Sequence, residues 1–351
     1  MNIAFLIDNS QTIQTIAALL VESVSQNHKC SVYATCNEKQ IDELNIDVDW
    51  FEFSDRRKLL KEFLKKRKKY DKIFGVNMFN GIWSDLYESN DKDVYALEYC
   101  WNELGTCHRE DFESNTKLIT NTEWSKSKIQ TTSKYENVFF MGSPWFEFLK
   151  KYSIPEKEKE YFAVVMAPHN SYYYQFPFFE EYANKFLETI QKFKQVTGMH
   201  IILKTREKYG DRFRDNKLFD QVISDQKAFE HLKLYSKARC VFHFCSSAIS
   251  ELSLLETYNV CVFPGCQAKL NLDDPEGLLK RKIGQRYYSG DIIDNIHCSK
   301  IDIPDLPRFY KEPTQFLEYI ETPKNWKQFQ DKFFSKGHEN ASKNILQFIQ
   351  T

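Results

Sequence analysis

Short apolar runs alternate with amphipathic stretches along the first 150 residues of the chain. The apolar runs have the length of buried strands, and they fall at residues 2–7, 31–35, 48–53, 72–76, 117–120 and 138–141. Between them, residues 12–26, 56–69 and 124–131 carry apolar side chains at helical spacing, and a further helix opens at Gly142-Ser143-Pro144. This alternation of strands and helices predicts a parallel, doubly wound sheet.

The same alternation restarts after residues 153–160, a charged segment that contains a proline. Strands are predicted at 162–166, 200–204, 221–224, 240–244 and 260–263, and helices at 178–197, 228–236 and 247–257. The fold class is therefore α/β, with two tandem Rossmann-like domains: residues 1–152, a linker at 153–160, residues 161–322, and C-terminal helices at 323–351 that return to the first domain. Open α/β sheets bind ligands at the carboxyl ends of their strands, so we expect a substrate cleft between the domains.

Length, charge and cysteine usage narrow the class of protein. The chain has 351 residues and a formal net charge of -1, which is long enough for two domains and gives no overall basic footprint for nucleic acid. It has no apolar run of ~18 residues that could span a membrane, and its first residues lack the pattern of a secretory signal. With nine Cys and no Cys-x-x-Cys pair, we expect reduced thiols and a cytoplasmic location.

The segment from Cys240 to Glu251 carries the most informative chemistry. An apolar strand leads into Ser246 and Ser247, which open a helix, and Glu251 follows four residues later. The free N–H groups and the positive dipole end of a helix N-terminus bind anions such as a diphosphate, and a carboxylate at this depth accepts both hydroxyls of a ribose. The structural alternative is a serine cap with a glutamate that the helix dipole favours.

The strand, serine pair, glutamate and following strand together resemble the donor-site motif of GT-B transferases. In particular, they resemble the set that contains CDP-glycerol glycerophosphotransferases, Kdo transferases and the related UDP-N-acetylglucosamine 2-epimerases. Further segments resemble other parts of that fold, at residues 138–146, 202–208, 222–236 and 333–349. The resemblance implies two Rossmann-like domains with a nucleotide donor in the second, and it places Asp225 and Phe229 near the base of the nucleotide.

Three further residues are candidates for contact with the donor. Lys204 and Arg206 end a predicted strand, where fixed cations would neutralise a leaving diphosphate without a metal ion. The alternative is a pair of solvated surface charges. His169 follows the first strand of the second domain and is placed to contact a phosphate or the donor sugar; otherwise it is a structural histidine. We expect no metal and no cofactor.

Candidates for a general base lie in the first domain. Asp8 follows the first strand, where a carboxylate can deprotonate an acceptor hydroxyl or can cap the next helix. Glu98 and His108 are rivals for this role, and they lie in a loop predicted at residues 95–111.

The leading hypothesis is a metal-independent GT-B glycosyltransferase that moves a sugar from a nucleotide-sugar donor to a glycan, polyol or other hydroxyl acceptor. A CDP-polyol phosphate transferase, a non-catalytic GT-B binding module and a UDP-sugar epimerase remain open as alternatives. The expected partners are the donor and the acceptor, and no nucleic acid.

Residues 58–69 form a basic amphipathic helix. Such a helix can contact an anionic membrane, and the alternative is a solvated outer helix of the first domain.

Overall fold

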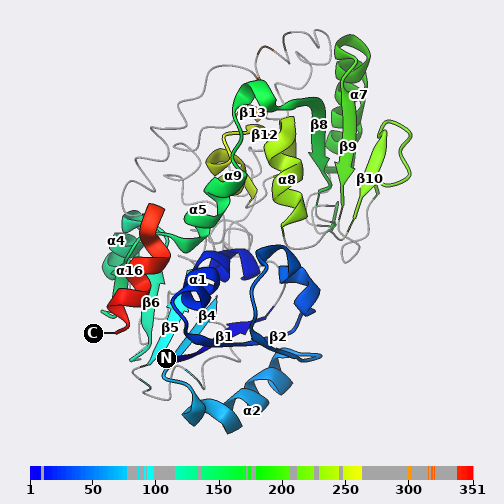
Figure 1. Ribbon diagram of the computed structural model, residues 1–351. Helices are drawn as coiled ribbons and strands as arrows, with labels where there is room; N and C mark the ends of the chain where they lie inside the picture. The colour runs from blue at the N-terminus through cyan, green and yellow to red at the C-terminus, as the bar shows by residue number, and fades with distance from the viewer. Residues whose placement is uncertain are drawn as a thin grey trace. The chain divides into compact units, whose positions relative to one another are not determined.

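The computed structural model of the chain contains two parallel sheets flanked by helices (Figure 1). It describes residues 1–8, 12–76, 86, 91, 93–98, 115–132, 136–168, 170, 173–174, 179–205, 212–224, 229–244, 248–262, 299–301, 315, 318, 320 and 338–350. These residues divide into two compact units. Unit 1 takes its described residues from 1–151, 229 and 338–350, and unit 2 takes them from 152–224 and 230–320.

Unit 1 is built on a parallel sheet whose strands lie in the order β3-β2-β1-β4-β5-β6-β7. Its strands are β1 (Asn2–Ile7), β2 (Lys29–Ala34), β3 (Asp49–Glu52), β4 (Lys72–Val76), β5 (Val94–Leu97), β6 (Lys117–Thr120) and β7 (Val138–Phe140). Its helices are α1 (Ile13–Ser25), α2 (Arg56–Lys66), α4 (Glu123–Thr132), α5 (Pro144–Leu149) and α16 (Ala341–Phe348), with 3-10 turns at Glu38–Leu44, Arg67–Lys69, Lys150–Tyr152 and His338–Asn340.

Alternation along the strands sends side chains to two covered faces of this sheet. On one face, Leu59 and Phe63 of α2 share a core with Val94 and Ala96 of β5. On the other face, the Tyr95 ring lies against Phe348 of α16, with 6.4 Å between ring centroids. Burial on both faces is the pattern of a parallel sheet in an α/β protein, and it explains why the strands read as nearly continuous apolar runs.

Unit 2 has a second parallel sheet, with strands in the order β10-β9-β8-β11-β12-β13. The strands are β8 (Glu160–Met166), β9 (His200–Lys204), β10 (Gln221–Ile223), β11 (Ala238–Phe244), β12 (Tyr258–Val262) and β13 (Ser299–Ile301), and the helices are α7 (Phe179–Thr197), α8 (Glu230–Lys237) and α9 (Ala248–Leu254), with a 3-10 turn at Glu156–Glu158. Helix α7 packs on β11 through Phe186, whose ring lies 5.1 Å from Phe244 and 5.9 Å from Phe242.

Two strands of the structure are missing from the sequence-based pattern. Strand β5 has four residues and is bordered by Asp93 and Glu98, so its apolar run is too short to stand out. It begins the region that the sequence assigned to a loop at 95–111, which corrects that assignment for residues 95–97. Strand β13 has three residues, and only its pairing with β12 identifies it.

The charged segment at 153–160 packs on unit 2. The Lys159 ammonium donates to the Ser236 carbonyl at 2.9 Å and to the Thr257 hydroxyl at 3.2 Å. Burial lowers the pKa of Lys159 to about 8. Glu156 accepts from the Tyr258 hydroxyl at 3.1 Å. These bonds tie the segment before β8 to the starts of β11 and β12.

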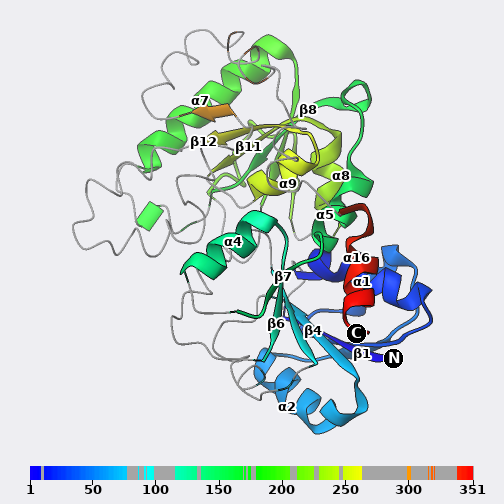
Figure 2. The same cartoon turned by 90° about the vertical axis from the view of Figure 1, so that its left-hand side faces the viewer.

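The C-terminal helix α16 belongs to unit 1 and lies beside α1 and α5 (Figures 1 and 2). The Ser342 hydroxyl and backbone N–H both donate to Glu147 Oε2, at 2.6 and 3.0 Å. Ile345 is fully buried at this contact. Among the helices that the structure describes, none is long and apolar enough to cross a membrane.

Truncating Ile345 should therefore destabilise unit 1. We expect Ile345→Ala to lower the free energy of unfolding by about 2–5 kcal/mol, because it removes buried methyl and methylene groups and leaves a cavity. Urea denaturation measures this change. Gln347→Ala, one position on the exposed side of the same helix, is the control and should change stability little. Equal stability of Ile345→Ala and wild type would show that α16 does not support the core.

Candidate functional site

The strand order identifies the ligand-binding edge of each sheet. In unit 1 the order reverses at β1, whose neighbours are β2 and β4. In unit 2 it reverses at β8, whose neighbours are β9 and β11. Ligands of open α/β sheets bind outside the carboxyl ends of the strands at such points. The candidate residues are therefore those that follow β1, β5 and β6 in unit 1, and β9 and β11 in unit 2.

Asp8 lies at the carboxyl end of β1 and is 7% exposed. Its carboxylate forms an ion pair with Arg56, the first residue of α2. The Thr35 hydroxyl donates to its backbone carbonyl. Burial raises the pKa of Asp8, whereas the Arg56 guanidinium acts in the opposite direction. The sequence did not single out Arg56, which lies within a run of basic residues.

Glu98 follows β5 directly and is 2% exposed. Its Oε2 accepts from the backbone N–H of Asn121 at 2.7 Å, and its Oε1 has no hydrogen-bond partner among the described residues. Burial raises the pKa of Glu98 to about 8, although the Asn121 N–H and the Ser125 hydroxyl act to lower it. At neutral pH this carboxyl is therefore mostly protonated, and it titrates in the range useful for acid–base catalysis.

A chain of hydrogen bonds leads away from Glu98 across the ends of β6 and β7. The Asn121 side-chain amide donates to the Glu98 carbonyl at 2.8 Å. Its Oδ1 accepts from the Ser143 hydroxyl at 2.8 Å. The Ser143 backbone N–H donates to His338 Nδ1 at 3.1 Å. The sequence marked Ser143 only as part of a predicted helix start.

In unit 2, Lys204 is the last residue of β9 and is half-buried. Its backbone carbonyl accepts from the Ala167 N–H at 2.9 Å, which joins the ends of β9 and β8. Lys204 is thus placed beside the point where the strand order of this sheet reverses. A cation at that edge can offset the charge of a phosphate group.

Glu251 lies in the first turn of α9, the seven-residue helix that follows β11. Its Oε2 lies 3.9 Å from His231 Nε2, on α8, and both side chains are mostly buried. The His231 ring in turn packs edge-on against Tyr235 at 5.6 Å. The sequence did not predict a role for His231, because His231 lies close to Glu251 only through the packing of α8 and α9.

A second histidine of unit 2 has a structural environment. His243 in β11 is fully buried, and its Nε2 lies 3.4 Å from Asn259 Oδ1 in β12. Burial lowers the pKa of His243 to about 4, so it stays neutral at physiological pH. We assign it to the core of the sheet.

Other predicted site residues fall outside this arrangement. Phe229 is buried in unit 1, where its ring lies 4.8 Å from that of Phe148. Six predicted residues lie outside the described part of the chain: His108, His169, Arg206, Asp225, Ser246 and Ser247. Within the described part, no group of three or more His, Cys, Asp or Glu side chains is arranged to hold a metal ion.

No protein-family model matches the sequence, and no curated protein matches it. Solved structures match over nearly the whole chain. The UDP-GlcNAc 2-epimerase of Methanocaldococcus jannaschii in complex with UDP-GlcNAc and UDP has a TM-score of 0.64 at 12% identity, covering 100% of this chain and 99% of that one. The S. aureus MnaA–UDP structure has a TM-score of 0.63 at 10% identity, with 100% and 96% covered.

A glycosyltransferase from Rickettsia africae is also similar, with a TM-score of 0.52 at 10% identity and 99% and 98% of the two chains covered. At this level of identity the likeness concerns the fold. The chain has the GT-B fold, with two Rossmann-like units, as the sequence resemblance predicted.

The buried Glu98 carboxyl should make folding stability depend on pH. Its pKa rises from 4.5 unfolded to about 8 folded, so the folded state retains a proton that the unfolded state has lost. This contribution is fully present below the unfolded pKa and disappears as pH rises through the folded pKa. Between these two pKa values, the ionisation of Glu98 lowers the free energy of unfolding of wild type by up to about 1.4 kcal/mol per pH unit. Glu98→Gln, which keeps the oxygen acceptor for Asn121, should lack this dependence.

Urea denaturation at several pH values, with wild type and Glu98→Gln compared at each, measures the effect. Other titrating groups are shared by the two proteins and cancel in the difference. A difference in unfolding free energy that stays constant from about pH 5 to about pH 9 would contradict the assignment.

Proposed function

We propose that this chain is a nucleotide-sugar enzyme, in which unit 2 binds the nucleotide and unit 1 supplies an acid or base that acts on the sugar or its acceptor. The observation that carries the proposal is Glu98. It is a buried carboxyl at the ligand-binding edge of a GT-B fold, and its pKa of about 8 suits proton transfer near neutral pH.

The nucleotide would bind at the carboxyl edge of the unit 2 sheet. Glu251 offers a carboxylate in the first turn of α9, where it could accept ribose hydroxyls. Lys204 offers a cation at the end of β9. Lys204 and Arg206 together would offset the charge that develops on the leaving diphosphate, so the reaction would need no metal ion and no cofactor. The similar M. jannaschii structure contains UDP-GlcNAc and UDP, which supports a UDP-sugar as the first donor to test.

The leading reaction is transfer of the sugar to a glycan or other hydroxyl acceptor. Asp8 and Glu98 are the candidates for the base, at the ends of β1 and β5. Asp8 has the Arg56 guanidinium beside it, whereas Glu98 must lose its proton before it can accept another. We assign Asp8 the role of base, because the Arg56 guanidinium opposes the rise in pKa that burial causes, and Glu98 the role of acid.

Epimerisation of a UDP-sugar is the second candidate. It is favoured by the UDP-GlcNAc 2-epimerases among the similar structures, which match 95–100% of their own length. Inverting a carbon centre requires a group that removes a proton and a group that returns one. A carboxyl that titrates near neutral pH, such as Glu98, can serve in either direction. This reaction would proceed without an acceptor.

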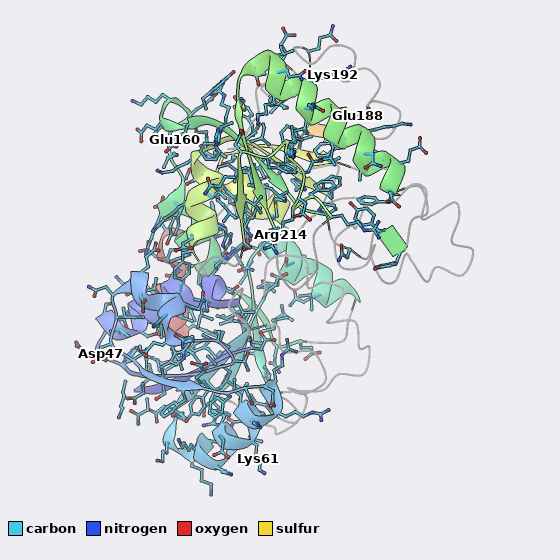
Figure 3. All side chains as sticks on the ribbon, turned by 90° about the vertical axis from the view of Figure 1, so that its right-hand side faces the viewer. Asp47, Lys61, Glu160, Glu188, Lys192 and Arg214 are labelled. Atoms are coloured by element: carbon cyan, nitrogen blue, oxygen red, sulfur yellow. The ribbon has the colours of Figure 1, made fainter. Side chains whose placement is uncertain are left out.

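We expect UDP to raise the thermal stability of the protein and Glu251→Gln to weaken its binding. A ligand at 100 times its Kd adds about 2.7 kcal/mol of apparent stability. Loss of the ribose contact should raise Kd about tenfold or more. Thermal-shift titration with UDP, GDP, ADP and CDP, with and without EDTA, measures both effects. Glu188→Gln, on the exposed side of α7 (Figure 3), should bind as wild type does.

If none of the nucleotides raises the thermal stability, the proposal is rejected. If Glu251→Gln binds UDP as tightly as wild type does, the assignment of the site is rejected. Product analysis then separates the two reactions. Conversion of a UDP-sugar into its epimer without an acceptor indicates epimerisation. Release of UDP that depends on an added acceptor indicates transfer.

We also propose that the outer side of α2 contacts an anionic membrane. Nine of the residues 56–69 are Lys or Arg and one is acidic, whereas the whole chain has a net charge of -1. Leu59, Leu60 and Phe63 are buried in the core, so the apolar side of the helix is already occupied. Lys61 projects outward from it (Figure 3), and Leu64 is 43% exposed on the same side. This surface would bind by charge and bring the enzyme to a membrane-borne acceptor.

Charge reversal on this surface should release the protein from anionic vesicles. We expect Lys61→Glu/Lys68→Glu to weaken binding to vesicles that contain phosphatidylserine by about tenfold or more, since each basic residue near such a surface contributes about 1 kcal/mol. Co-sedimentation with phosphatidylserine vesicles measures this. Lys39→Glu/Lys157→Glu, exposed lysines elsewhere, is the matched control. Equal sedimentation of both variants, or equal binding to neutral vesicles, would contradict the proposal.

A further inference from the structure

Glu98 is held by two contacts with one residue, one to its carboxyl and one to its backbone carbonyl. The Asn121 backbone N–H donates to Glu98 Oε2 at 2.7 Å, and the Asn121 side-chain amide donates to the Glu98 carbonyl at 2.8 Å. Asn121 itself is 2% exposed. The rotamer of Asn121 and the path of the chain at the ends of β5 and β6 therefore fix where the carboxyl lies.

Asn121 is oriented by a residue from the next strand. Its Oδ1 accepts from the Ser143 hydroxyl at 2.8 Å, and the same hydroxyl accepts from the Phe146 N–H at 3.0 Å as the N-cap of α5. The Ser143 hydroxyl has one proton to give. Because that proton goes to Asn121, the side chain of Asn121 is set with its amide group toward Glu98.

Ser143 is held in turn by the C-terminal part of the chain. Its backbone N–H donates to His338 Nδ1 at 3.1 Å, which requires a neutral His338 with its proton on Nε2. The His338 ring is 6% exposed and packs edge-on against Phe146 at 4.8 Å. The residues joined by this bond are 195 positions apart in the sequence.

Within the described part of the chain, no charged group shifts the ionisation of the Glu98 carboxyl. The influences on the Glu98 carboxyl there are burial, the Asn121 N–H and the Ser125 hydroxyl, and none is a charged group. A carboxyl without a charged neighbour depends on its hydrogen bonds to ionise, because each bond to the carboxylate favours the charged form. The position of the Asn121 backbone N–H thus has a direct effect on proton release, and the side chain of Asn121 helps to fix that position.

We propose that His338 is a positioning residue for Glu98: acting through Ser143 and Asn121, it sets the geometry of the carboxyl and so the pH at which the carboxyl ionises. The C-terminal segment would then control the acid–base group of unit 1 without contacting the substrate. This role for the segment rests on the proposed function, but the contacts that carry it do not.

The test compares His338→Leu with His338→Asn. Leucine removes the acceptor for the Ser143 N–H, whereas the Asn oxygen can replace Nδ1. The free energy of unfolding of each variant is measured from about pH 5 to about pH 9, both alone and combined with Glu98→Gln. At each pH, the difference between the two proteins isolates the contribution of Glu98, and its pH dependence gives the midpoint of Glu98 ionisation. We expect His338→Leu to raise this midpoint by about one pH unit, equivalent to about 1.4 kcal/mol, because the misplaced Asn121 N–H no longer favours the carboxylate. His338→Asn should restore it.

Ser342→Ala is the matched control. It removes the hydrogen bond from the Ser342 hydroxyl to Glu147 Oε2, a different contact between the C-terminal segment and α5. It leaves the hydrogen bonds from His338 through Ser143 to Asn121 intact. It should lower stability without moving the midpoint. If His338→Leu does not fold, Ser143→Ala tests the same chain one step closer to Glu98 and should shift the midpoint in the same direction.

An unchanged or lowered midpoint in the folded His338→Leu or Ser143→Ala protein would overturn the proposal, as would an equal shift in Ser342→Ala. These measurements use the protein without nucleotide. A shifted midpoint in a protein that turns over no nucleotide sugar would leave the positioning role standing and reject the proposed function alone. Turnover of a nucleotide sugar with an unshifted midpoint would reject the positioning role and leave the proposed function standing.

Discussion

Both sheets are parallel throughout, and the candidate site depends on this constraint more than on any single contact. In a parallel sheet every strand ends at the same edge, so the residues that follow the strands gather there although they are far apart in the sequence. Asp8, Glu98 and Asn121 meet the same edge of unit 1 for this reason. Parallel pairing also requires helices on both faces. Helix α2 supplies Arg56 to Asp8, and the 3-10 turn before α16 supplies His338 to Ser143.

The two carboxyls of unit 1 are buried in different surroundings. Burial raises the pKa of Asp8, and its guanidinium partner Arg56 opposes that rise because it favours the charged form. Glu98 has hydrogen-bond donors and no charged partner among the described residues. An unpaired buried carboxylate is costly, so a carboxyl in this setting keeps its proton to a higher pH. The ends of β1 and β5, which β4 separates in the sheet, thus offer an acid and a base from the same kind of side chain, and environment separates their roles.

The hydrogen-bonded chain from Glu98 to His338 also explains why the C-terminal helix belongs to unit 1. Buried polar groups destabilise a protein unless they are paired, and Ser143 and Asn121 find their partners within this chain. Helix α16 adds apolar cover through Ile345 and Phe348. Packing and polar pairing therefore reinforce each other at the same place, so the segment is held firmly beside the residues that it orients.

The sequence by itself determined the elements whose signals are local. Apolar runs and helical spacing identified all but two of the strands that the structure describes. Ser143-Pro144 marked a helix start that the structure confirms, and the resemblance indicated the GT-B fold. The sequence also placed Asp8 and Glu98 among the candidates, Asp8 because it follows a predicted strand and Glu98 as a carboxylate in a predicted loop. It did not reveal β5, whose four residues acquire their identity from β4 and β6. Nor did it reveal Arg56, His231 or His338, because pairing between residues tens to hundreds of positions apart has no local signal. Tertiary structure alone decided which carboxyl has a cation beside it and which is buried without one, and that difference sets their protonation.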